Sequence, residues 1–153
     1  MELKYECLKF EDIPSHTLYE ILKLRQEVFI VEQDCPYLDA DGKDYEAYHV
    51  IVTKQNEIVA YTRILKKGIS YDEYSAIGRV INKKNVRGKG VGKLLMEYSI
   101  QKTFELYPRD SIKISAQTYL HNFYTNLGFQ KVGDGYLEDD IPHQAMIYKT
   151  NAQ

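Results

Sequence analysis

A glycine-rich segment near the middle of the chain constrains the fold more than any other feature. The segment Arg87-Gly88-Lys89-Gly90-Val91-Gly92 follows a short apolar run, Ala76 to Asn82, and leads into a helical stripe of apolar residues that ends near Pro108. The first N–H groups of a helix have no partners within it, and the helix dipole makes that end positive. Because glycines let the backbone approach an anion closely, this strand–loop–helix unit predicts an anion-binding site.

The spacing of the glycines argues against two nucleotide-binding motifs. A Walker loop needs Gly-x-x-x-x-Gly-Lys-Ser/Thr, but Leu94 follows Gly92-Lys93 and Arg87 stands where the first glycine should be. A dinucleotide fingerprint needs Gly-x-Gly-x-x-Gly, and Lys93 takes the third glycine's place. We therefore do not expect ATP, GTP or NAD to bind in these modes.

The hydrophobic periodicity along the chain predicts a mixed α/β fold. Strands are expected at 3–10, 45–54, 57–67, 76–82, 111–117, 129–133 and 145–149, and helices at 15–29, 91–108 and 119–127. This order, β-α-β-β-β-α-β-α-β-β, indicates a mixed sheet with helices on its faces. With 153 residues, 44% of them hydrophobic, we expect a single domain over residues 1–153.

Charge and cysteine content narrow the functional class. The formal net charge is −2 with no block of like charges, which argues against a general nucleic-acid binder. Two cysteines, Cys7 and Cys35, do not make a disulfide framework. The chain has no apolar run resembling a signal peptide and none near the ~18 residues that span a bilayer. We expect a soluble cytoplasmic protein that does not enter membranes.

The aspartate-rich stretch at residues 32–44 does not match a metal site. In Asp39-x-Asp41-Gly42 the glycine comes too early for an EF-hand loop, and Val50 stands where the closing Glu should be. The two cysteines are far apart, with no paired histidines to complete a zinc site. No metal is expected, and the aspartates are interpreted first as turn formers.

The glycine loop and a later segment together resemble the GNAT superfamily of N-acetyltransferases. Arg87, Gly90 and Gly92 match its Arg/Gln-x-x-Gly-x-Gly/Ala motif, and Tyr124 followed by Gly128-Phe129 matches its second motif. Between them, Gln117 ends a strand where the superfamily more commonly has Asn. Two motifs in the right order and separation are much more specific than either one alone.

Further segments resemble the ElaA-type branch of this superfamily. These are Leu24 to Gln33, Cys35 to Asp44, Ile77 to Val80 and Glu138 to His143, with Asp140 in place of an expected Gly. The resemblance implies the GNAT fold, a mostly antiparallel splayed sheet flanked by helices, and acetyl-CoA as cosubstrate. It does not imply a particular acceptor.

The resemblance also implies roles for individual residues. The loop Arg87 to Gly92 would hold the CoA pyrophosphate, Gln117 would contact pantetheine, and the backbones of Val80 and Ile81 would pair with the pantetheine amides and polarise the thioester carbonyl. Members of the superfamily generally transfer the acetyl group directly to an amine. Tyr124, a phenol with a reference pKa of ~10, would donate a proton to the departing CoA thiolate.

The amine acceptor arrives protonated, so a base or a water chain must remove a proton. The candidates are Glu32 at the end of the first helix, His143 in the loop before the last strand, and His49, which is more simply a hydrogen-bonded core or pocket histidine. Asp39 and Asp41 could also form an acidic rim that attracts a cationic amine. Neutralising both should then raise the Michaelis constant of the acceptor and not that of acetyl-CoA.

The sequence leaves three alternative functions open. The protein could be a non-catalytic acyl-CoA sensor, or a scaffold that forms a homodimer. Arg25-x-x-Val28-Phe29 also resembles the first helix of acyl-homoserine-lactone synthases, although those usually carry Trp residues nearby and this chain has none. The acceptor itself could be a protein N-terminus, a lysine, a polyamine or an amino acid.

Overall fold

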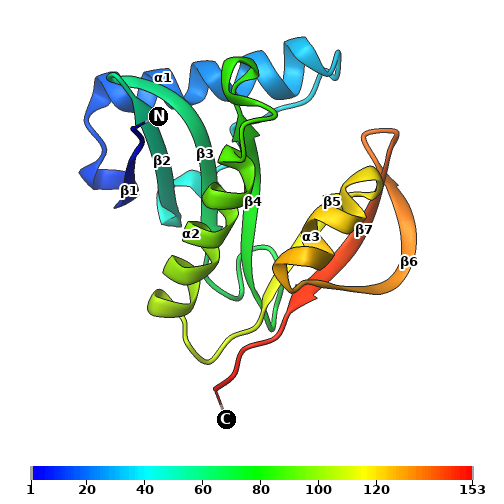
Figure 1. The fold of residues 1–153 in the computed structure, drawn as a ribbon. Coiled ribbons are helices and arrows are strands. Elements are labelled where there is room, and N and C mark those ends of the chain that lie inside the picture. The colour runs from blue at the N-terminus through cyan, green and yellow to red at the C-terminus, as the bar shows by residue number, and fades with distance from the viewer. Residues whose placement is uncertain (1, 153) are drawn as a thin grey trace.

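The computed structural model describes residues 2–152 and contains a seven-stranded sheet in the order β1-β2-β3-β4-β5-β7-β6 (Figure 1). The strands are β1 (Lys4–Lys9), β2 (Tyr48–Lys54), β3 (Glu57–Leu65), β4 (Ser75–Asn82), β5 (Ile112–Gln117), β6 (Gln130–Glu138) and β7 (Ile141–Tyr148). The α-helices are α1 (Ser15–Arg25), α2 (Val91–Leu106) and α3 (His121–Leu127). The predicted order of strands and α-helices is confirmed.

Helices pack on both faces of the sheet. Helix α1 covers one face of β2, β3 and β4, where Ile21 and Leu24 pack against Ile51, Tyr61 and Ile81. Helices α2 and α3 pack on the opposite face, in a larger core that spans β2 to β7. The alternation of side chains along each strand sends successive residues to these two cores, as in Ile51 between Val50 and Val52 of β2.

The first helix is longer and less regular than predicted. Helix α1 ends at Arg25, and the chain continues as a π-helical segment, η2 (Gln26–Glu32), instead of stopping at Phe29. A period of 3.6 residues does not reveal a stretch with i→i+5 bonding, so the sequence pattern missed it. The segment carries Glu32 and the residues after it toward the end of β4.

Two strand predictions also need correction. Residues 45–47 are not part of β2, because a 3-10 turn, η3 (Lys43–Glu46), precedes it. The predicted loop around residues 138–143 is a tight hairpin turn, in which Asp139 and Asp140 have φ values of 51° and 61°. Aspartate tolerates this left-handed conformation, so β6 and β7 extend to Glu138 and from Ile141.

Strands β4 and β5 diverge, and this divergence positions the site. They are the parallel neighbours in an otherwise antiparallel sheet, and they pair only at Ser75–Ile112 and Ala76–Lys113. Beyond these residues the two ribbons separate, as Figure 1 shows. A β-bulge at Arg79, with φ 50°, lies on β4 just past the point of separation. The predicted mixed, splayed sheet is therefore confirmed.

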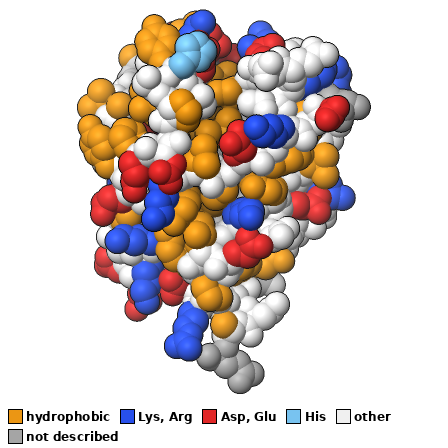
Figure 2. Space-filling view, turned by 90° about the vertical axis from the view of Figure 1, so that its left-hand side faces the viewer, with side chains coloured by type: hydrophobic (Ala, Val, Ile, Leu, Met, Phe, Trp, Pro, Cys, Tyr) orange, Lys and Arg blue, Asp and Glu red, His pale blue; other side chains and the backbone are white. Residues whose placement is uncertain are grey.

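The surface near β1 is mixed in character. On the face shown in Figure 2, positive and negative side chains are interspersed with hydrophobic ones. Within residues 2–152, no helix is both long enough and apolar enough to cross a membrane.

Candidate active site

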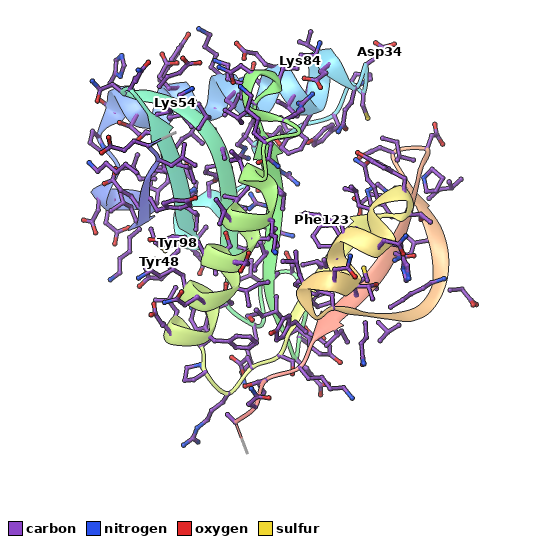
Figure 3. The ribbon with its side chains drawn as sticks, in the orientation of Figure 1. Asp34, Tyr48, Lys54, Lys84, Tyr98 and Phe123 are labelled. Carbon is purple, nitrogen blue, oxygen red and sulfur yellow. The ribbon has the colours of Figure 1, made fainter. Side chains whose placement is uncertain are left out.

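A cleft of about 670 Å³ lies where β4 and β5 diverge. Gly78, Arg79 and Val80 line it from β4, and residues 115–117 line it from β5. Helix α3 closes one side, where Phe123 points toward β4 (Figure 3). Past their last paired residues, the edges of β4 and β5 have no strand between them, so their backbone N–H and C=O groups can pair with an extended ligand.

The glycine loop lies at one end of this cleft. Gly88 and Gly90 have φ values of 76° and 80°, a conformation that favours glycine, and nothing lies within 4 Å of the position that a Cβ would take at either residue. Gly90 caps α2, which begins at Val91. Gly92 lines the cleft, and a Cβ there would lie 3.1 Å from Asn82 Nδ2. Arg87 and Gly92 thus bring the loop to the cleft beside the N-terminus of α2, whereas Gly88, Gly90 and Val91 do not line it.

Two further polar residues line this end of the cleft: Asn82 offers an acceptor to a donor group of a ligand, and Arg87 offers positive charge to an anion. Asn82 lines the cleft, and its Oδ1 is buried without a hydrogen-bond partner. Arg87 also lines the cleft, and its Nε donates to the carbonyl of Asn82 at 2.8 Å. Lys89, at the tip of the loop, is exposed and does not line the cleft. The residues present therefore suit a phosphate-bearing group bound along β4.

Glu32 is brought to the cleft but is already engaged. Its two carboxylate oxygens accept from Arg87 Nη1 and Nη2, at 2.5 and 3.2 Å. The hydrogen bond from Arg87 lowers the pKa of Glu32 below its usual range, against a small opposing effect of burial. A carboxylate held in this way is a weak base at neutral pH.

Tyr124 lies in the wall of the cleft formed by α3. Its side chain is 6% exposed, and its ring packs edge-on against Phe123 and Phe129. Burial, and to a lesser extent Tyr119, raises the pKa of Tyr124 to about 12. The phenol is therefore protonated at neutral pH and can act only as a proton donor there.

Of the three residues predicted to contact pantetheine, Val80 and Gln117 line the cleft and Ile81 does not. Val80 lines the cleft, whereas Ile81 is 1% exposed and its side chain packs under α1, which leaves only its backbone for a ligand. Gln117 lines the cleft at the end of β5. Its register partner on β7 is His143, so the two side chains lie on the same face of the sheet. Tyr124 belongs to the core on the opposite face.

His143 lies within β7 and not in a loop as predicted. It lines the cleft and is only 7% exposed. Its Nδ1 lies 2.7 Å from the carbonyl oxygen of Ile141, and its Nε2 lies 3.3 Å from Glu138 Oε2. The ring stacks on its register partner Tyr136 of β6, with a centroid distance of 6.3 Å and an interplanar angle of 19°.

Ser115 and Glu138 join His143 in one polar cluster, a grouping that the sequence did not reveal. Ser115 Oγ donates to Glu138 Oε1 at 3.2 Å and lies 2.5 Å from the hydroxyl of Tyr136. Ser115, Glu138 and His143 all line the cleft. The only sequence signal was the ElaA-like segment that ends at His143, because Ser115 and Glu138 are 23 residues apart and meet through sheet register.

The predicted acidic rim is wrong. Asp39 and Asp41 do not line the cleft; they pair with arginines instead. Asp39 is 5% exposed, and its carboxylate lies 2.7 Å from Arg25 Nε and 2.8 Å from Arg79 Nε. Asp41 accepts two hydrogen bonds from Arg63, at 2.8 and 2.9 Å. These carboxylates are neutralised within the protein, so they leave no free negative charge for an acceptor.

His49 is a core histidine, as the simpler interpretation held. It is fully buried, with Nδ1 at 2.6 Å from the hydroxyl of Tyr61 and Nε2 at 3.0 Å from the carbonyl oxygen of Asp44. Burial lowers the pKa of His49, which keeps the ring neutral. Because both nitrogens are occupied and the residue does not line the cleft, it is not placed to act on a ligand there.

The described residues also bear on metal binding and on attack by a cysteine thiol. Among residues 2–152, no three His, Cys, Asp or Glu side chains are grouped to hold a metal ion. Cys35 lines the cleft, and desolvation together with the carboxylates of Asp139, Asp140 and Asp34 raises the pKa of its thiol. A thiol that stays protonated is a poor nucleophile.

A family model, a similar sequence and two solved structures all relate this chain to GNAT acyltransferases and ElaA. Residues 22–150 match the model of the GNAT acetyltransferase domain. The protein ElaA of Escherichia coli is 38% identical over 94% of this chain and 95% of its own length. Its crystal structure, and that of an acyl-CoA N-acyltransferase from Pseudomonas aeruginosa, each superpose with a TM-score of 0.91 at 37% identity, over 97% of this chain and all of theirs.

A more distant likeness concerns the fold alone. An aminoglycoside 6'-N-acetyltransferase, whose structure was solved as a complex with coenzyme A, superposes with a TM-score of 0.69 at 14% identity. The alignment covers 96% of both chains.

Proposed function

This chain belongs to the GNAT acetyltransferase family, in its ElaA-like branch, and we propose that it transfers an acetyl group from acetyl-CoA directly to a primary amine. The observation that carries this proposal is the cleft between β4 and β5, which has a bare glycine loop at one end and the buried phenol of Tyr124 in its wall. A phosphate site and a proton donor in one cleft are what a CoA-dependent acyl transfer needs.

Acetyl-CoA is the proposed first substrate. Its pyrophosphate would lie at the N-terminus of α2, on the backbone of Gly88 to Gly92 with Arg87 beside it. Its pantetheine arm would run between the strands, where Val80 and Gln117 line the cleft and Ile81 follows Val80 on β4. The distant fold relative that was solved with coenzyme A supports this class of ligand.

Binding in this position requires Arg87 to change partners. Its guanidinium is paired with Glu32. A pyrophosphate would compete for the same donors, and an exposed ion pair contributes only ~0–1 kcal/mol, so exchange is inexpensive.

Direct transfer fits the cleft better than an acyl-enzyme route. An acyl-enzyme needs a nucleophile, and the thiol in the described lining is that of Cys35, whose raised pKa keeps it protonated. The rate would then come from holding the amine against the thioester carbonyl and from protonating the leaving thiolate through Tyr124.

A thermal-shift screen with acetyl-CoA, NAD and ATP tests the ligand assignment. A ligand at 100 times its dissociation constant adds ~2.7 kcal/mol to the free energy of unfolding, which is easily measured. We expect stabilisation by acetyl-CoA and CoA. Stabilisation by ATP or NAD, with none by CoA, would overturn the assignment.

The variant Arg87→Gln sharpens this screen. A hydrogen bond to a charged group contributes about 1.5–3 kcal/mol, so we expect the variant to bind acetyl-CoA at least tenfold more weakly. Arg109→Gln is the matched control, because Arg109 is an exposed arginine that does not line the cleft. Equal loss of affinity in both variants would indicate nonspecific charge attraction.

A further inference from the structure

We infer that His143, assisted by Glu138, is the base that removes the proton from the acceptor amine. This inference rests on the proposed function and names the group that takes up the proton in it. It is carried by the position of the His143–Glu138 pair in the cleft and by the partners of the two ring nitrogens.

The other two candidate bases are unsuited. Both carboxylate oxygens of Glu32 accept from Arg87, and its lowered pKa makes it a weak base. His49 is fully buried and does not line the cleft. His143 remains, and unlike His49 it lines the cleft.

The carbonyl of Ile141 fixes which nitrogen of His143 can act. A carbonyl oxygen only accepts hydrogen bonds, so Nδ1, at 2.7 Å from it, must carry the ring proton. Nε2 is then the nitrogen with a free lone pair in the neutral ring. When Nε2 takes a proton, the imidazolium lies 3.3 Å from Glu138 Oε2, which stabilises it. The Ile141 carbonyl thus orients the ring through Nδ1, as the carboxylate of a Ser-His-Asp triad does, whereas Glu138 faces Nε2, the nitrogen that takes the proton.

Neighbouring side chains contact both members of the His143–Glu138 pair. Ser115 of β5 donates to Glu138, and Tyr136 of β6 stacks on the imidazole. Tyr71, on the segment before β4, lies close enough to Tyr136 and Glu138 for them to add to the effect of burial, which raises its pKa to about 12. Tyr71 is thus a neutral neighbour at physiological pH.

Charged groups of both signs lie near this cluster. Besides Glu138, the carboxylate of Asp139 lines the same cleft. The ammonium of Lys113 is held over the Tyr71 ring, 4.8 Å from its centroid. On β5, the register partner of His143 is the uncharged Gln117.

The proposed acid and base act from opposite faces of the sheet. His143 shares a face with Gln117, whereas Tyr124 belongs to the core on the other face, and both line the cleft between β4 and β5. An acyl-CoA held between the strands would therefore have the acid on one side and the base on the other. This separation suits direct transfer, because the amine attacks the carbonyl carbon on one side and the thiolate leaves it on another.

In the proposed transfer, His143 takes a proton from the amine and Tyr124 gives one to the thiolate, while the acetyl group moves from sulfur to nitrogen. The ammonium of the acceptor gives one proton to Nε2 of His143, and the freed nitrogen lone pair forms the bond to the carbonyl carbon of the thioester. The C–S bond then breaks, and the thiolate takes the proton of Tyr124. The nitrogen loses its second proton, which restores the Tyr124 phenol through solvent, and His143 releases its proton to solvent past the half-exposed Glu138.

The test compares His143→Gln and Glu138→Gln with the wild-type protein across a pH series. The readout is the release of CoA thiol from acetyl-CoA with an amine that the wild-type protein accepts. Removal of a general base should lower the rate on the order of 10²–10³-fold in His143→Gln and abolish the acidic limb of the pH–rate profile. In Glu138→Gln the imidazolium loses its neighbouring negative charge, so we expect a smaller fall in the turnover number, with the Michaelis constant of acetyl-CoA little changed.

Two controls separate a base from a structural role. His16→Gln makes the same change at an exposed histidine outside the cleft and should leave the profile unchanged. Added imidazole should partly restore the rate of His143→Ala.

The outcomes distinguish the two proposals. A wild-type rate with a normal pH profile in His143→Gln overturns the base assignment alone, and a wild-type turnover number in Glu138→Gln overturns the part given to Glu138. No thiol release by the wild-type protein with any amine overturns the proposed function, and the base assignment fails with it.

Discussion

At the scale of single residues, Tyr124 is a buried phenol that suits the role of proton donor proposed for it. Its ring is held by Phe123 and Phe129, and its side chain is 6% exposed. Burial raises the pKa of Tyr124 to about 12, which keeps the phenol protonated. A proton donor in the wall of a cleft, with its orientation fixed by packing, is the arrangement that can protonate a leaving thiolate without rearranging.

We predict that Tyr124→Phe lowers the turnover number by on the order of 10²-fold or more while acetyl-CoA still binds. The change removes only the hydroxyl, so the aromatic packing stays. Steady-state kinetics and calorimetric titration with acetyl-CoA measure the two effects separately. Tyr119→Phe is the control, because it removes a hydroxyl from an exposed tyrosine at the cleft. An unchanged turnover number in Tyr124→Phe would remove the proposed role.

Residues in local motifs were the ones that could be predicted from the sequence. Arg87, Gly92, Gln117 and Tyr124 were expected at a CoA site, and all four line the cleft. The pairing of Arg87 with Glu32 was not predicted, because it joins residues that are 55 positions apart. Asp39 and Asp41 misled for the same reason: their arginine partners come from other elements, and only the folded chain shows them.

At the scale of elements, a buried ion network fixes the 33–44 segment to the sheet. Arg25 of α1, Arg63 of β3 and Arg79 of β4 bind the carboxylates of that segment. Arg25 is fully buried, so its charge requires these partners. The bulge that gives Arg79 its positive φ also lies in the wall of the cleft, so the network helps to hold β4 in its diverging position.

Asp44 gives this network a measurable pH dependence. Burial alone would raise the pKa of Asp44, but hydrogen bonds and charges from Arg25 and Arg63 outweigh it and hold the pKa below its usual range. A lowered pKa in the folded state stabilises the protein above the unfolded value of ~3.9. That contribution is lost as the pH falls through the folded value.

We therefore predict that Asp44→Asn lowers the free energy of unfolding by about 3–5 kcal/mol at neutral pH, because it leaves buried arginines underpaired. The difference from wild type should narrow below about pH 4, where the carboxylate binds a proton in the unfolded chain while it is still charged in the folded protein. Urea denaturation at several pH values measures it. Asp12→Asn, at an exposed aspartate, is the control and should show little effect. An equal difference at neutral and acidic pH would contradict the account.

The elements themselves were largely predictable, and their exceptions have physical causes. Apolar periodicity and turn residues predicted every strand and α-helix in order. The π-helical segment, the Asp139-Asp140 turn and the bulge at Arg79 were missed, because each depends on a backbone conformation that periodicity does not encode. The divergence of β4 and β5 was expected only through the GNAT resemblance.

At the scale of the whole molecule, the sheet opens between β4 and β5, and one cleft brings together the groups to which we assign three functions. The loop before α2 offers an anion site, α3 offers an acid, and the β6–β7 hairpin offers the proposed base. No single element contains more than one of these groups. The chemistry therefore depends on the parallel β4–β5 junction that brings the two parts of the sheet together.

The most direct test of this account is the transfer reaction itself. The purified protein is mixed with acetyl-CoA and a panel of primary amines, and both CoA thiol and acetylated amine are quantified by mass spectrometry. We predict that at least one amine is acetylated in equal amount to the thiol released, and that this requires Tyr124. Tight binding of acetyl-CoA with no acetylated product from any amine would contradict the enzyme assignment and favour an acyl-CoA-binding module.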